Sequence, residues 1–305
     1  MFEKLKDKLL SGEWLTLETT PAKAASFAPI VERLRALDLP RFVDGFTVTD
    51  NPLAKLRYGS LFAAVKLQEA FGKPVLATLS MRDRNLIALQ SDILGCNEFG
   101  IRAFLAVTGD SASLSDQPHA KGVFESNSNE LLSIMRSFNF GIDYAGKAID
   151  PAPQPIYPFA VTQSRTKNPA SLMRKIAGKI EHGAIGIITQ PVFSIADARR
   201  LAEIFDEARR EFKDERQNAR LIVGVFPLTR LKTAQFLHAH VPGIEVADSW
   251  IAALSEANRL SAQEEERVGF ELSSELFHAL RDEGFAVHLM CANRFELAAK
   301  LLTSA

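Results

Sequence analysis

Cysteine is scarce in this chain of 305 residues: Cys96 and Cys291 are the only two, and they lie far apart in the sequence. This argues against a disulfide framework and against a cysteine-ligated zinc site. Only six histidines are present, so a histidine metal site is not expected either. Apolar runs stay well short of the roughly 20 residues of a membrane helix, and residues 1–14 lack the apolar core of a signal peptide. We therefore expect a cytoplasmic protein without a bound metal.

An excess of charge of one sign is also missing. Lys and Arg number 36 and Asp and Glu number 37, which gives a net charge of −1 with both signs mixed along the chain. No basic surface for nucleic acid or an anionic membrane is therefore expected. The dinucleotide-binding pattern G-x-G-x-x-G follows none of the apolar runs. Residues 141–148 nearly match a phosphate-binding P-loop, but Ala148 stands where a hydroxyl would hold magnesium, so nucleotide hydrolysis is not expected.

What the sequence does contain is a regular alternation of short apolar runs and helical patterns. The apolar runs are mostly continuous, which is typical of parallel strands covered on both faces. Strands are predicted at 14–17, 42–48, 75–79, 103–107, 156–161, 184–188, 221–226 and 286–290. Helices are predicted at 25–37, 61–71, 86–96, 129–138, 172–182, 195–212, 233–240 and 294–302. Eight strands, each followed by a helix, predict an α/β protein with the (β/α)8 TIM barrel fold.

Two segments make this chain longer than a minimal barrel. Residues 111–128 form a polar loop after the fourth strand, and a loop of this length is a candidate lid or ligand loop. Residues 251–280 predict a helical insertion before the last strand. No low-complexity tract or change of composition marks a linker, so we expect residues 1–305 to form one catalytic barrel domain. A doubly wound sheet is the weaker alternative, because its nucleotide-binding fingerprint is missing.

Barrel enzymes carry out their chemistry at the carboxyl ends of the strands, so we examined only those positions. The polar residues found there are Glu18, Thr49, Asp50, Asn51, Thr78, Thr108, Gly109, Asp110, Thr189, Gln190, Asn293 and Arg294, with Arg82, Asp83 and Arg84 in the loop after the third strand. These residues should converge although they are scattered in the sequence. Acids, amides, hydroxyls and an arginine suit a polar heterocyclic substrate that carries a carboxylate.

Each of the main candidates has a structural alternative. Glu18 could be a solvated charge, although it directly follows a buried strand. Asp110 could cap the next helix, but its glycine partner and the long loop behind it favour ligand binding. Gln190 could satisfy buried backbone groups, and Arg294 could be a surface charge at the start of a helix.

Four segments in this order resemble methylenetetrahydrofolate reductases: VTDNPLAKLR at 48–57, RDRNLIALQSDILG at 82–95, AVTGD at 106–110 and ITQPVF at 188–193. The VTDN and RDRN segments are similar to one bacterial-type branch of these flavin-dependent enzymes, and the resemblance extends from Glu18 to Arg294. It implies that hydride passes from NADH or NADPH to a flavin, FAD with FMN as the alternative. Reduced flavin then converts 5,10-methylenetetrahydrofolate to 5-methyltetrahydrofolate in ping-pong fashion. The expected setting is one-carbon metabolism and methionine biosynthesis, in a homo-oligomer.

The resemblance also implies roles for individual residues. Glu18 would be the general acid that opens the five-membered ring of the folate, and Asp110 would bind the pterin and stabilise the cationic iminium. Gln190 would hydrogen-bond the pterin, and Arg294 would meet the glutamate tail. The flavin would contact Thr49, Asp50, Thr78, Thr108, Gly109 and Asp110, with Lys179 near a phosphate.

The chain departs from the best-known members at several of these positions. Thr19 and Thr20 replace aromatic residues after the acid, Asp50 replaces a tyrosine and Thr108 replaces an arginine. Thr233 stands where a folate-contacting glutamine is expected. Three alternatives therefore remain: a folate- or flavin-binding subunit that takes electrons from a partner protein, a relative working in the oxidative direction during demethylation, and an unrelated barrel with a phosphorylated substrate.

Overall fold

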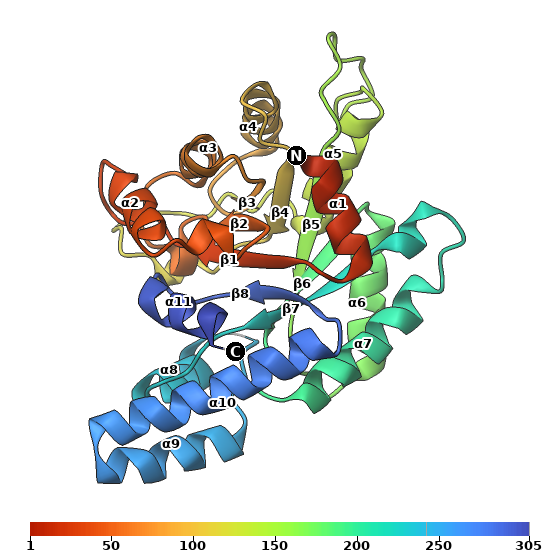
Figure 1. Ribbon diagram of the computed structural model, residues 1–305. Coiled ribbons are helices and arrows are strands. Elements are labelled where there is room, and N and C mark those ends of the chain that lie inside the picture. Colours follow the sequence, from red (N-terminus) through yellow and green to blue (C-terminus); the bar gives the residue numbers. More distant parts are fainter. Residues whose placement is uncertain (242, 305) are drawn as a thin grey trace.

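The computed structural model describes residues 1–241 and 243–304, and its eight parallel strands close into a barrel in sequence order (Figure 1). The strands are β1 (Leu15–Thr19), β2 (Gly45–Val48), β3 (Val75–Ser80), β4 (Ala103–Val107), β5 (Tyr157–Thr162), β6 (Gly186–Pro191), β7 (Arg220–Val225) and β8 (Ala286–Leu289). β8 pairs with β1, so no strand edge is left open. The predicted (β/α)8 barrel is confirmed, and each predicted strand overlaps an observed one.

Helices cover the outside of this sheet in the predicted order. They are α2 (Ala28–Ala36), α3 (Ser60–Phe71), α4 (Leu86–Glu98), α5 (Ser128–Asn139), α6 (Pro169–Glu181), α7 (Ile195–Arg209), α8 (Leu231–His240) and α11 (Phe295–Thr303). α7 illustrates why they form. Ser194 caps its first turn by accepting a hydrogen bond from the Asp197 N–H at 3.1 Å, and Ala198, Leu201 and Phe205 face the core. No described helix is long and apolar enough to cross a membrane.

The amino-terminal helix α1 (Phe2–Ser11) is absent from the elements predicted above. Its buried residues Phe2, Leu5 and Leu9 recur at helical spacing and belong to the same apolar cluster as the residues that fill the barrel interior. Trp14, which is fully buried in that cluster, leads from α1 into β1. α1 therefore closes the end of the barrel opposite the carboxyl ends of the strands, and it leaves that other end for the site.

The insertion before β8 consists of two helices, α9 (Asp248–Leu260) and α10 (Ala262–Asp282). They pack against each other and project from the barrel at the lower left of Figure 1. Ser261 separates them and caps α10. Gly269 brings α10 close to the chain after β7, because a Cβ there would lie 2.4 Å from the Leu228 carbonyl oxygen. The predicted helical insertion is thus present, with wider bounds.

Alternating side chains divide the strands between two apolar layers. Outward-facing residues such as Leu17, Phe46 and Phe104 pack under the helices. Inward-facing residues such as Leu76 and Ile222 fill the barrel together with α1. Toward the carboxyl ends of the strands this inner packing stops, and the space there is the cavity described next.

Candidate active site

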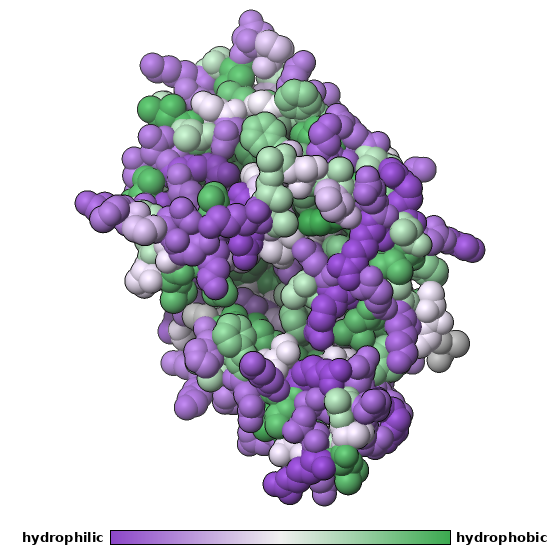
Figure 2. Space-filling view, turned by 90° about the vertical axis from the view of Figure 1, so that its left-hand side faces the viewer, coloured by the Kyte–Doolittle hydropathy of each residue, from purple (hydrophilic) through white to green (hydrophobic). Residues whose placement is uncertain are grey.

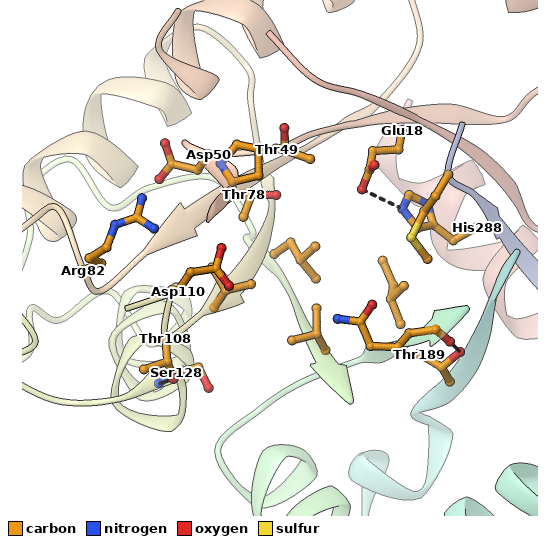
Figure 3. A pocket seen from close by; sticks show the side chains of 18 of the residues that line it. Glu18, Thr49, Asp50, Thr78, Arg82, Thr108, Asp110, Ser128, Thr189 and His288 are labelled. Atoms are coloured by element: carbon orange, nitrogen blue, oxygen red, sulfur yellow. Dashed lines mark hydrogen bonds and ion pairs between the residues drawn. The ribbon is translucent and has the colours of Figure 1, made fainter. Parts of the chain in front are cut away.

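A cavity of about 430 Å3 lies at the carboxyl ends of the strands (Figure 3). The molecular face seen in Figure 2 is hollowed near its centre, and hydrophobic and hydrophilic residues are mixed around the hollow. Predicted site residues that line the cavity are Glu18, Thr49, Asp50, Thr78, Thr108, Gly109, Asp110, Lys179 and Gln190. The structure therefore brings these scattered residues together, as expected when parallel strands end at one rim.

Glu18 belongs to a small polar chain across β1 and β8. Its Oε2 atom lies 3.7 Å from Nε2 of His288, and Nδ1 of His288 lies 2.8 Å from the Thr16 hydroxyl. His288 and Thr16 are both buried. The imidazole is thus held from one side by the threonine while its other nitrogen faces the Glu18 carboxylate. Sequence analysis missed His288, although its place two residues after Ala286 on β8 puts it on the inward face.

Asp50 lines the cavity, but its carboxylate is engaged by the scaffold. One oxygen accepts from the Ser60 hydroxyl at 3.0 Å, and the other accepts from the Ser80 N–H at 3.1 Å and from Arg84 at 2.5 Å. Arg84 also donates to Asp92 at 2.8 Å. Burial opposes the charge on Arg84, yet the charges of Asp50 and Asp92 hold its pKa above the ordinary value. The carboxylate of Asp50 therefore fixes the loop after β3, and a contact of Asp50 with flavin stays a prediction.

Gly109 and Asp110 form a tight turn after β4. Gly109 has φ = 93°, and a Cβ there would lie 2.2 Å from the Ser80 hydroxyl oxygen, so only glycine fits. The turn directs the Asp110 side chain into the cavity, on the side opposite Glu18 (Figure 3). Oδ2 of Asp110 accepts a hydrogen bond of 2.6 Å from the Leu53 N–H.

Lys179 supplies a cation at another side of the cavity. Its Nζ atom lies 3.3 Å from the hydroxyl of Ser128, the first residue of α5. Burial, with a smaller contribution from Lys175, lowers the pKa of Lys179. Within the described residues no carboxylate pairs with this ammonium group. A partly buried lysine beside a helix amino terminus is suited to an anionic group such as a phosphate.

Most of the wall built by β4, β5 and β6 is apolar, although Thr189 and Gln190 of β6 also line the cavity. Leu105 and Val107 come from β4, Val161 from β5 and Ile188 from β6. These residues were not predicted as part of the site, because only polar residues at the strand ends were expected to mark it. Leu105 and Val107 are two positions apart on β4, which places their side chains on the same face of the strand. This spacing is the sequence signal by which they could have been predicted. An apolar wall opposite acids and hydroxyls suits a flat heterocycle with a polar edge.

Arg294 does not line this cavity. Its guanidinium donates to the Pro227 carbonyl at 2.7 Å and to the Thr229 hydroxyl at 3.2 Å, and it stacks over Phe226 with 5.6 Å to the ring centroid. Burial lowers its pKa. Arg294 lines a separate pocket together with Thr233, so the two predicted folate-contacting positions lie together, outside the main cavity. A contact with the glutamate tail stays a prediction.

Comparison with protein families decides the identity of this barrel. The family model described as "Methylenetetrahydrofolate reductase" matches residues 4–305. The chain belongs to the methylenetetrahydrofolate reductase family. Membership agrees with the resemblance of the four sequence segments, and it makes a folate-related oxidoreductase the class to which this barrel is assigned.

Solved structures share the fold at low sequence identity. A protein from Clostridium thermocellum that binds two copies of 5-methyl-5,6,7,8-tetrahydrofolic acid has a TM-score of 0.64 at 15% identity, with 98% of this chain and 97% of that chain covered. EDTA monooxygenase from Chelativorans sp. BNC1 has a TM-score of 0.58 at 11% identity, with coverage of 95% and 91%. DmoA from Hyphomicrobium sulfonivorans has a TM-score of 0.56 at 11% identity, with coverage of 94% and 85%. A sequence search of curated proteins gave no match.

Proposed function

We propose that this protein reduces 5,10-methylenetetrahydrofolate to 5-methyltetrahydrofolate, with NADH or NADPH as the hydride source. The observation that carries this proposal is the placement of Glu18 and Asp110 on opposite sides of one cavity whose third side is apolar. Family membership and the folate-binding Clostridium thermocellum structure support folate as the ligand class. The proposed setting is cytoplasmic one-carbon metabolism.

In this proposal the two acids have different tasks. Glu18 gives a proton to the nitrogen that leaves as the five-membered ring opens, and the remaining nitrogen and carbon form a cationic iminium. Asp110 stabilises that positive charge from the opposite side. Thr16 holds the His288 ring, whose other nitrogen faces the Glu18 carboxylate. Gln190 lines the same cavity and is the proposed hydrogen-bond partner of the pterin.

The residues present fit a flavin bearing a phosphate. Thr49, Thr78, Thr108 and Gly109 offer hydroxyl and backbone groups along one rim, and Lys179 offers a cation that no described carboxylate neutralises. When bound, a flavin supplies the hydride that completes the reduction. FAD is the proposed form and FMN is the alternative.

One experiment tests the reaction and its alternatives. The purified protein is titrated anaerobically with NADH or NADPH, and then with 5,10-methylenetetrahydrofolate, while the visible spectrum is recorded. Bleaching followed by return of the yellow colour supports the proposal. Protein that neither contains nor takes up a flavin contradicts the flavin mechanism. A flavin that bleaches only with dithionite points to a partner protein as electron donor. Faster flavin reduction by 5-methyltetrahydrofolate than by nicotinamide points to the oxidative direction.

A further inference from the structure

The loop between β2 and α3 contains backbone conformations that are unusual for its residues. Asn51, Leu53 and Ala54 have positive φ angles of 45°, 55° and 55°, although none of them is glycine. Such conformations are unfavourable for residues other than glycine and persist only where their surroundings hold them. Strain of this kind is found at sites where a fixed geometry serves a purpose.

Hydrogen bonds at both ends of this loop hold it in place. Arg82 donates to the Asn51 carbonyl at 2.9 Å, and the Asn51 side chain accepts from the Arg57 N–H at 2.9 Å. Farther along, the Leu56 N–H donates to Oδ1 of Asp116 at 3.0 Å. Asp116 belongs to the long polar loop after β4 and does not line the cavity. We call residues 51–57 the clasped loop.

The strained residue Leu53 directs its N–H at Asp110. The bond to Oδ2 is 2.6 Å long, and among the described residues it is the only hydrogen bond that the Asp110 carboxylate accepts. A carboxylate on a turn can rotate unless a hydrogen-bond donor fixes its orientation. A backbone N–H in a loop that is already rigid can do this at little further cost in entropy. Oδ1 accepts no hydrogen bond from a described residue, and Asp110 lines the cavity.

We propose that the clasped loop is a positioning element for Asp110, and that Asp116, outside the cavity, acts on the folate site through Leu53 and Asp110. The inference rests on the proposed function, since it assigns the loop a role in folate binding by Asp110. It predicts that loosening the far end of the loop at Asp116 weakens folate binding, although Asp116 itself touches no ligand.

The first test needs no folate. Amide hydrogen exchange of a peptide covering residues 51–57 is measured in the wild-type protein, Asp110→Ala, Asp116→Ala and the control Asp214→Ala. Asp214 is matched to Asp116 because it also caps a backbone N–H at the surface, accepting from Arg216 at 3.1 Å, in a different loop. We expect faster exchange of this peptide in Asp110→Ala and Asp116→Ala and no change in Asp214→Ala. Unchanged exchange in Asp110→Ala overturns the inference whatever the protein binds.

The second test is a double-mutant cycle read by 5-methyltetrahydrofolate binding. Asp116→Ala is expected to weaken binding roughly 3–10-fold, the order of one modest hydrogen bond, and this effect should vanish in the Asp110→Ala background. If the fold-changes in folate affinity caused by Asp116→Ala and Asp110→Ala multiply in the double variant, the positioning role is overturned. In that case Asp116 contributes to folate binding independently of Asp110. If the wild-type protein binds no folate, the proposed function fails, and the exchange measurement alone decides whether the clasped loop and Asp110 hold each other in place.

Discussion

Two halves of the cavity wall differ sharply in chemistry. β8, β1, β2 and β3 contribute acids, a histidine and hydroxyls, among them Glu18, His288 and Thr78. β4, β5 and β6 contribute mainly aliphatic side chains, among them Val161 and Ile188, and the polar exceptions are Thr189 and Gln190 of β6. Both halves come from the same parallel sheet, so the difference lies in the side chains and not in the backbone.

This comparison separates two tasks that one site must combine. The polar half has groups that can transfer or hold a proton. The aliphatic half has apolar surface against which a flat ring can be buried away from water. Substitutions in the polar half should therefore change reaction rates with little effect on stability. Substitutions in the aliphatic half should change stability or affinity with little effect on the chemical step.

The largest effect is expected for Glu18→Gln in the polar half. Removing the proton donor should lower folate turnover by about 10²–10⁴-fold, while reduction of the flavin by nicotinamide and folate affinity stay near wild type. Rapid-reaction spectroscopy of the two half-reactions measures this. Glu13→Gln is the matched control, because Glu13 lies before β1 at the opposite end of the barrel and is exposed. Full folate turnover in Glu18→Gln would remove Glu18 from its proposed role.

Ile188→Ala removes a buried side chain from the aliphatic half of the cavity wall. Ile188 is 2% exposed, and its truncation should lower the free energy of unfolding by about 2–4 kcal/mol. Chemical denaturation measures this change, with Ile87→Ala as the control at a side chain that is 75% exposed. A large fall in the rate of the chemical step, at unchanged stability, would contradict the division between the two halves.

Lys179→Met tests whether the ammonium group of Lys179 binds the phosphate of the flavin. Loss of a charged hydrogen-bond donor should weaken binding of FMN or FAD by about 10–100-fold. The lysine binds an anion in its protonated form, and burial lowers its pKa, so wild-type affinity should fall with rising pH before the ordinary lysine range near 10.4 is reached. Flavin fluorescence titrations at several pH values measure both effects. Arg174→Met, at an exposed position on the same helix, is the control. Flavin affinity that is independent of both Lys179 and pH would place the phosphate elsewhere.

The smallest effect is expected for a reciprocal exchange between the halves. Val107→Thr adds a hydroxyl to the aliphatic wall at nearly constant shape and should weaken folate binding by roughly 2–5-fold. Thr78→Val makes the opposite change on the polar side and should weaken flavin binding while leaving folate binding closer to wild type. Isothermal titration with each ligand compares the two variants. Equal effects of both variants on both ligands would show that the halves do not serve different ligands.

Much of the fold could be predicted from local patterns. Continuous apolar runs predicted the strands, and the convergence of parallel strand ends brought residues as distant as Glu18 and Gln190 to one cavity. Helix α1 escaped prediction because its few apolar residues, interspersed with lysines, are explained only by the barrel end that they close. His288 was not predicted because it lies within β8, whereas the predicted site residues were those at and beyond the strand ends.

The placement of Arg294 shows a different limit. Its position after the last strand predicted a place at the barrel mouth, but the structure ties it to the Pro227 carbonyl and the Phe226 ring, in a neighbouring pocket. Asp50 was likewise predicted at the mouth and does line it, yet Arg84 and Ser80 engage its carboxylate. The sequence positions of Arg294 and Asp50 predicted where their backbones lie. The hydrogen-bond partners of their side chains come from other parts of the chain and could not be predicted in this way.

The sequence by itself determined the order of strands and helices, the polar strand ends and the resemblance to a folate reductase, because these depend on residue type and spacing along the chain. The tertiary structure alone decided which of those polar groups face a ligand and which hold the scaffold. The physical reason is that a hydrogen bond such as that between Leu53 and Asp110 joins residues 57 positions apart, and only the pairing of β2, β3 and β4 in one sheet brings them within 2.6 Å.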